Sequence, residues 1–213
     1  MSNSTVTVDI FSDVVCPWCV IGGVRLAKAM QLRPELTFER YWHPFMLDPD
    51  AVPGQPWQAT MTAKFGSEAK VTQMFEYVTN VATQEGLRFD FDAIPCTTNT
   101  HDAHRLILLA STYQLTWPLT DALYSAYFSE GADINDHAVL SDIAVRVGLP
   151  ADKVAELLTT DAFAEIVTRS QQTAAQLGIS GVPFFIFNRR LAVSGAQSVE
   201  YMLQAIDEAC ATS

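Results

Sequence analysis

Two cysteines lie three positions apart near the start of the chain, in the run Cys16-Pro17-Trp18-Cys19. Two residues between cysteines bring the sulfurs to disulfide-bonding distance, so such a pair can carry out thiol–disulfide exchange. The same spacing also supplies half of a tetrahedral zinc site. Which chemistry applies depends on the other ligands in the chain and on the elements that position the pair.

A zinc site needs about four ligands, usually from two closely spaced pairs. The other two cysteines, Cys96 and Cys210, are isolated, and no histidine lies near Cys16 in the sequence. We therefore expect no metal. We interpret Cys96 and Cys210 as small apolar residues without a redox role.

The elements around the pair favour redox chemistry. Residues 5–11 alternate in the manner of a strand. Pro17 suits the first turn of a helix, which has to end before Pro34. Its apolar residues recur at helical spacing at Val20, Val24, Ala27 and Met30. Cys16 is thereby placed at a helix N-terminus, where backbone N–H groups and the helix dipole favour a thiolate. We predict that Cys16 is the nucleophile and that Cys19, one turn on and more buried, resolves the mixed disulfide.

The rest of the chain predicts a mixed architecture. Residues 36–42 read as a second strand and the proline-rich stretch 43–57 as a loop. About a hundred residues with helical periodicity follow. Helices are expected from Ser67 to Gly86, from about Thr98, from Pro118 to Gly131, from Asp136 to Gly148, and after Pro150.

Two further strands are expected in the last fifty residues. Residues 161–178 predict a long helix and Val199 lies near the start of a final one. Between them lie two strands, expected at 184–187 and 190–193, joined by a two-residue turn at Asn188-Arg189. The order β-α-β, helical block, α-β-β-α predicts an α/β fold. We expect one domain from residues 1–56 and 161–213, with an all-helical insertion at 57–160.

Four stretches resemble the DsbA family of thioredoxin-like proteins, in its FrnE-like branch. The run from Ser12 to Cys19 resembles the active site of that family, and Gly181-Val182-Pro183-Phe184-Phe185 resembles its cis-proline loop. Asn99 to Arg105 resembles a helix start of the branch, and Gly195-Ala196-Gln197 a stretch near its end. The resemblance implies a thioredoxin-like core, βαβ followed by αββα, that carries the all-helical insertion.

The resemblance also implies where substrate binds. Pro183 is expected to be cis and to lie against the cysteine pair, with Val182 offering its backbone to an extended substrate by strand addition. Pro17 and Trp18, between the two cysteines, are also expected to bind substrate. Periplasmic members often carry a histidine between the cysteines, and Pro17-Trp18 replaces it here, so a strongly oxidising pair is not implied.

These observations predict a thiol–disulfide oxidoreductase or isomerase that acts on protein or small-molecule disulfides without a tightly bound cofactor. One alternative is a glutathione-dependent enzyme of the same fold, similar to kappa-class glutathione transferases and 2-hydroxychromene-2-carboxylate isomerases. Gln197 and Ser198, at a helix start, would then hold a glutathione carboxylate. Those enzymes typically lack the second cysteine, which Cys19 supplies here. The other alternative is a non-enzymatic holdase.

The charge balance excludes several partners. The 213 residues include 24 acidic and 13 basic side chains, a formal net charge of −11. This charge repels phosphate backbones and anionic lipid surfaces, so no nucleic acid and no membrane is expected as a partner. A secretory signal pattern is not seen, and apolar runs fall short of the roughly 20 residues of a spanning helix. We expect a cytoplasmic protein; its oligomeric state is not set by the sequence.

Several other polar residues lie near the motifs. Asp9 and Asp13 are expected to be exposed carboxylates, or in the case of Asp13 a turn cap, rather than proton shuttles for Cys19. His101 and His104, three residues apart, are expected on a helix surface. His43 precedes a loop that could border the active site.

Overall fold

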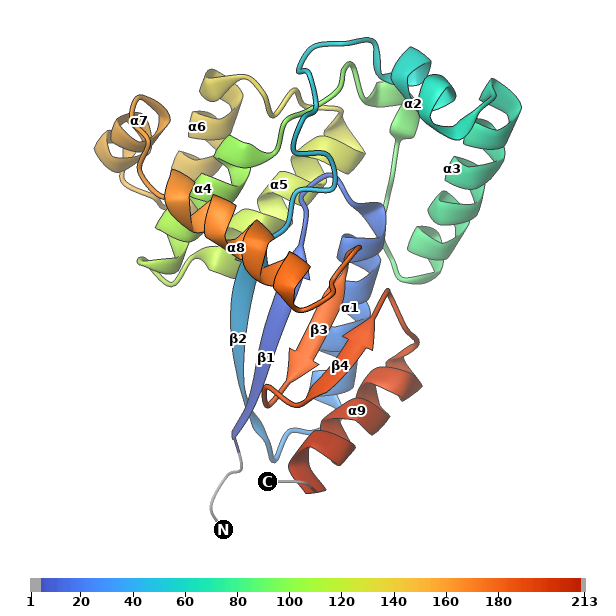
Figure 1. The fold of residues 1–213 in the computed structure, drawn as a ribbon, viewed down its shortest axis with the longest axis vertical. Coiled ribbons are helices and arrows are strands. Elements are labelled where there is room, and N and C mark those ends of the chain that lie inside the picture. The colour runs from blue at the N-terminus through green and yellow to red at the C-terminus, as the bar shows by residue number, and fades with distance from the viewer. Residues whose placement is uncertain (1–4, 212–213) are drawn as a thin grey trace. The chain divides into compact units, whose positions relative to one another are not determined.

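The computed structural model describes residues 5–211, and the chain divides into two compact units (Figure 1). The sheet unit contains the chain up to residue 47 and from residue 170 onward, and the helical unit contains residues 48–169. The boundaries expected from the sequence follow residues 56 and 160, nine residues away from the observed ones in each case.

The described residues of the sheet unit form a four-stranded sheet in the order β2-β1-β3-β4. β2 is parallel to β1, whereas β3 is antiparallel to both β1 and β4. The α/β class and the β-α-β and β-β-α segments expected from the sequence are confirmed. The elements are β1 (Thr5–Ser12), α1 (Pro17–Gln31), β2 (Thr37–Pro44), β3 (Phe184–Phe187), β4 (Leu191–Ser194) and α9 (Val199–Ala211).

A tight turn joins β3 to β4. Asn188 and Arg189 have positive φ angles of 48° and 56°, which matches a hairpin turn with two left-handed residues. Because Phe187 pairs with Leu191, the connection has three residues, one more than expected. The side chain of Asn188 accepts a hydrogen bond from the Thr7 N–H at 2.9 Å, so it ties the turn to β1.

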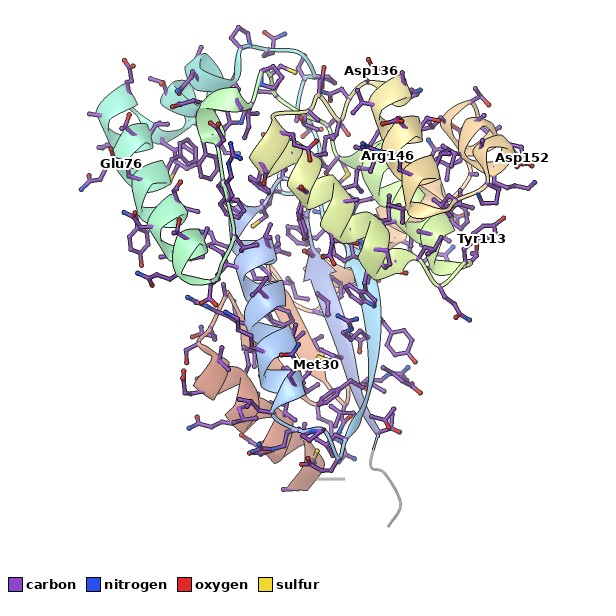
Figure 2. All side chains as sticks on the ribbon, turned by 180° about the vertical axis from the view of Figure 1, so that it is seen from behind. Met30, Glu76, Tyr113, Asp136, Arg146 and Asp152 are labelled. Atoms are coloured by element: carbon purple, nitrogen blue, oxygen red, sulfur yellow. The ribbon has the colours of Figure 1, made fainter. Side chains whose placement is uncertain are left out.

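The sheet has two covered faces. Helices α1 and α9 lie on one face of the sheet, which is toward the viewer in Figure 2. Alternate residues of β1 are buried: Val6, Val8 and Ile10. On the opposite face Phe11 packs in a buried cluster with Phe45, Ala174 and Ile179, of which Ala174 lies near the end of α8 (Ala164–Gln176). Strand β1 thus buries apolar residues on both of its faces.

The helical unit contains the following elements among its described residues: α2 (Trp57–Phe65), α3 (Glu68–Gln84), the 3₁₀ turn η1 (Phe91–Ala93), α4 (His101–Ser111), α5 (Thr116–Glu130), α6 (His137–Val147), α7 (Ala151–Leu158) and the start of α8. Between residues 5 and 211 no helix is both long and apolar enough to cross a membrane.

The helix caps expected from the sequence are confirmed. The Ser67 hydroxyl accepts a hydrogen bond from the Lys70 N–H, and the Asp136 carboxylate accepts one from the Ala138 N–H at 2.7 Å. Figure 2 shows Asp136 at the start of α6 and Arg146 near its end. Helix α2 was not expected as a separate element, because Trp57 is the buried residue of that helix and its apolar pattern is weak.

Helix α4 contributes two buried polar residues, His104 and Arg105, to the helical unit. Arg105 as a whole residue is 4% exposed. Its guanidinium donates to the carbonyl oxygens of Leu157, Thr160 and Ala162 and to the Asp102 carboxylate. It thereby fixes the segment between α7 and α8. His104 is fully buried on the same helix, so its expected place on the helix surface is wrong. Three-residue spacing indicates a shared face but not whether that face is covered.

Candidate active site

Cys16 occupies the N-cap position of α1. Its backbone is extended, with φ −97° and ψ 109°, and Pro17 follows at the first helical position. No acidic side chain lies in the first turn. Cys16 therefore lies at the positive end of the helix dipole, without a carboxylate on the same turn.

Cys19 lies one turn further along α1, in hydrogen-bonding contact with Cys16. Burial raises the pKa of the Cys19 thiol well above its ordinary value, and the hydrogen bond and charge of Cys16 raise it further. The hydroxyl of Ser12 and the backbone of Asp13 oppose that rise. Each cysteine exposes 4% of its surface, so the expectation that Cys19 is the more buried residue does not hold by this measure.

The loop before β3 meets the cysteine pair. The peptide bond between Val182 and Pro183 is cis. The Cys16 thiol donates a hydrogen bond to the Val182 carbonyl oxygen, with a sulfur–oxygen distance of 3.5 Å. The structure thus brings Val182 and Pro183 to Cys16 across 166 residues of sequence. Trp18 and Pro17 are half-buried beside them on the first turn of α1.

The two other expected binding residues lie at the start of α9. Both Gln197 and Ser198 are exposed. The Gln197 side-chain amide donates to the Ser194 carbonyl oxygen at 2.8 Å, and the Ser198 hydroxyl accepts from the Tyr201 N–H at 3.2 Å. Their polar groups therefore take part in local structure, Ser198 as a helix cap.

A close approach of α1 to the cis-proline loop was not foreseen from the sequence. A Cβ atom at Gly22 would lie 2.9 Å from the Pro183 Cγ atom. The Arg25 Nη1 atom donates to the Ala196 carbonyl oxygen at 2.7 Å. Both residues lie in an ordinary helical pattern, and their partners follow more than 150 residues later, so no local signal marks them.

Asp9 of β1 and Asp13, which directly follows β1, are also placed differently from the expectation. Asp13 is fully buried, so the expectation of an exposed carboxylate at this position is wrong. Asp9 is not exposed either, because its carboxylate lies 2.7 Å from the His43 Nε2 atom. His43 in turn stacks on the ring of Phe11, with 4.6 Å between ring centroids.

The remaining cysteines belong to other elements than the pair. Cys96 is a residue of the helical unit, and Cys210 lies in the last turn of α9. Both are partly buried and free. Burial raises the pKa of each thiol, and nearby carboxylates, Asp133 for Cys96 and Asp207 for Cys210, add to the rise.

The chain is similar to known proteins over nearly its whole length. The sequence profile of the family described as DSBA-like thioredoxin domain matches residues 7–207. A probable DsbA oxidoreductase from Streptomyces coelicolor is 34% identical, with 98% of this chain and 91% of that chain covered and a TM-score of 0.92.

Two more distant structures share the fold. One is a 2-hydroxychromene-2-carboxylate isomerase, 14% identical, with 97% of each chain covered and a TM-score of 0.71. The other is the cytosolic disulfide reductase DsbM from Pseudomonas aeruginosa with GSH, 18% identical, with 97% of this chain and 96% of that chain covered and a TM-score of 0.62.

Proposed function

Because this chain belongs to the family of DsbA-like thioredoxin domains and has their thioredoxin-like fold, we propose that it is a thiol–disulfide oxidoreductase or isomerase. Cys16 and Cys19 exchange with the disulfides of proteins or small molecules. The similar structure from Streptomyces coelicolor, a probable DsbA oxidoreductase, supports this proposal.

One observation carries the proposal: Cys16 is the N-cap residue of α1, and its sulfur lies 3.5 Å from the Val182 carbonyl oxygen. The helix end favours negative charge on that sulfur. The carbonyl next to it is a main-chain acceptor, which an extended substrate can pair with as it would in a sheet. A substrate disulfide held there lies beside the attacking sulfur, with Cys19 one turn away.

The reduction of a substrate disulfide needs only the thiols of Cys16 and Cys19 as the source of electrons. The Cys16 thiolate attacks one sulfur of the substrate disulfide, a mixed disulfide forms, and the other substrate sulfur leaves as a thiolate that takes up a proton. Cys19 loses its proton and attacks the Cys16 sulfur, which releases the second substrate thiol. The substrate has gained two electrons, and Cys16 and Cys19 are left joined in a disulfide. The reverse sequence oxidises a dithiol substrate.

A thiol reductant has to restore the dithiol after each reduction. We propose a glutathione-class thiol as the co-substrate for this step: one thiol attacks the Cys16 sulfur and releases Cys19 as a thiol, and a second attacks the resulting mixed disulfide, so that an oxidised dimer leaves and the Cys16 thiol is restored. DsbM was solved with GSH, and its fold is shared by this chain. A metal plays no part in this scheme.

We also propose a cytoplasmic location and a place in the FrnE-like branch. The cytosolic neighbour DsbM supports the first, and the Asn99–Arg105 stretch that resembles a helix start of that branch supports the second. Fractionation of cells that express the untagged chain tests the location. Recovery in the membrane or secreted fraction contradicts it.

Reduction of insulin by dithiothreitol or glutathione tests the reaction. The wild type should accelerate it, Cys16→Ser should fall to the uncatalysed rate, and Cys19→Ala should accumulate mixed disulfides with insulin chains. A Cys16→Ser variant that still accelerates reduction would overturn the proposal.

The same variants separate the two alternatives. A glutathione-dependent isomerase or transferase predicts that Cys19→Ala keeps full activity with glutathione on a small substrate. A holdase predicts that suppression of client aggregation survives in the variant that lacks both Cys16 and Cys19. If the wild type does not reduce insulin and one of these results is found, the corresponding alternative replaces the proposed function.

A further inference from the structure

One face of α1 lies directly against the cis-proline loop. A Cβ atom built on Gly22 would meet the Pro183 Cγ atom at 2.9 Å, the Phe185 Cζ atom at 3.2 Å and the Ala196 Cα atom at 3.4 Å. The first distance is shorter than Cβ atoms tolerate, and the proline ring is not a flexible side chain that can turn away. Any side chain at position 22 therefore displaces the loop.

Arg25 lies one turn along the same face, since residues three apart on a helix are neighbours. Its guanidinium donates to the Ala196 carbonyl oxygen at 2.7 Å, and the adjacent Gly195 N–H donates to the Pro183 carbonyl oxygen at 2.8 Å. A charged donor forms a stronger hydrogen bond than a neutral one. A chain of two hydrogen bonds thus connects α1 to Pro183 through the segment before α9.

The helix that supports the loop is the helix that carries the nucleophile. Cys16 is the N-cap residue of α1, and its thiol donates to the carbonyl oxygen of Val182 in the same loop. A helix is rigid over the two turns between Cys16 and Gly22. The contacts at Gly22 and Arg25 therefore determine how far the Val182 carbonyl lies from the Cys16 sulfur.

We infer that Gly22 and Arg25 are positioning residues for the substrate strand, an inference that rests on the proposed function. Gly22 lets the loop approach and Arg25 holds it there. Neither residue touches the reacting sulfurs. Their substitution should weaken the binding of extended disulfide substrates more than it slows the chemical steps, because the Val182 carbonyl moves while the start of α1 stays in place.

The chain offers a matched pair of glycines for the test. Gly22 and Gly23 are adjacent on α1, and neither has a positive φ angle, but a Cβ atom at Gly23 would meet nothing within 4 Å. Alanine at either position brings the same gain in helix propensity. Gly22→Ala should raise KM for insulin at least fivefold with kcat changed less than twofold, whereas Gly23→Ala should change neither by more than twofold.

Arg25 is tested in the same assay. Arg25→Met keeps the length of the side chain and loses the donor, and it should raise KM at least threefold; Arg25→Lys keeps the charge and one donor and should recover part of that loss. Arg33→Met is the control, because Arg33 follows α1 and its guanidinium donates to Asp207 on α9 at 2.7 Å rather than to the loop. It should leave KM within twofold of the wild type.

Two further measurements make the result decisive. Iodoacetamide should modify Cys16 at the wild-type rate in Gly22→Ala and Arg25→Met. Hydrogen exchange in the peptide that spans residues 182–197 should speed up in both variants and not in Gly23→Ala. Unchanged KM and unchanged exchange would overturn the inference. If the wild type does not reduce insulin, the proposed function fails, and faster exchange still shows whether Gly22 and Arg25 position the loop.

Discussion

The carboxylate of Asp13 accepts a hydrogen bond from the backbone N–H of Leu47 at 2.8 Å. The two preceding N–H groups are bound as well: Phe45 donates to the Ser12 carbonyl oxygen at 3.1 Å, and Met46 donates to the side chain of Gln171 at 2.9 Å. Three consecutive amides after β2 are thus tied to the segment that leads to the cysteines and to α8. Asp13 anchors this segment from a fully buried position.

Variants of Asp13 distinguish a structural role, as acceptor of the Leu47 N–H, from a role in proton transfer to or from Cys19. Asp13→Asn keeps an oxygen acceptor for Leu47 and removes the acid, so we expect its free energy of unfolding to stay within about 1 kcal/mol of the wild type. Asp13→Ala loses the acceptor and should cost about 1–3 kcal/mol. Urea denaturation measures both. Insulin reduction by Asp13→Asn should stay within threefold of wild type; a loss of a hundredfold or more would show that the acid moves a proton.

Cys19 makes stability depend on pH in the alkaline range. Its pKa is raised in the folded state, so the unfolded chain loses the proton first as the pH rises above about 8.5. Stability is then lost with rising pH, by up to about 1.4 kcal/mol per pH unit, until the folded thiol itself ionises. Unfolding curves of the reduced protein between pH 7 and pH 10 should show this slope.

The control is Cys19→Ser, in which this titration is absent while Cys96 and Cys210 still titrate. The difference in unfolding free energy between wild type and Cys19→Ser should shrink steadily above pH 8.5. A difference that is constant across that range would mean that burial does not raise the Cys19 pKa.

The two isolated cysteines should be dispensable for the reaction. Burial raises the pKa of Cys96 and of Cys210, which keeps both as poorly nucleophilic thiols at neutral pH. The double variant Cys96→Ala/Cys210→Ala should reduce insulin within twofold of the wild-type rate. A fall of more than tenfold in a protein that keeps its circular dichroism spectrum would reveal a second redox centre.

Gly131 is the most constrained glycine of the helical unit. It ends α5 with a φ angle of 63°, and a Cβ atom there would lie 2.1 Å from the Ala93 carbonyl oxygen. Gly131→Ala combines backbone strain with a clash against main chain and should cost about 3 kcal/mol or more. Gly66 ends α2 with a φ angle of 101° and open space around it. Gly66→Ala should therefore cost only about 1–2 kcal/mol in urea denaturation.

The parts of the fold that depend on neighbouring residues were predictable from the sequence. The caps at Ser67 and Asp136 and the left-handed residues at Asn188 and Arg189 are set by local backbone chemistry. Cys16 at the start of α1 belongs to this group, because a strand, a proline at the first helical position and an apolar repeat mark the helix start.

Residues whose role depends on distant partners were not predictable in the same way. Asp13 is buried because its acceptor role involves Leu47, 34 residues later, and β2 extends to Pro44 because it pairs along the whole of β1. Gly22 and Arg25 look like ordinary helix positions, and their meaning comes from Pro183 and Ala196. Residue type and spacing carry no information on such contacts.

The long separation between Cys16 and Val182 also has a consequence for synthesis. A ribosome adds about 5–20 residues per second, so the sequence separation of 166 residues takes roughly 10–30 s to translate. During that interval β1, α1 and β2 are present without β3, and the whole helical unit is being made. A nascent chain therefore carries its dithiol for most of translation before the cis-proline loop exists to receive a substrate strand.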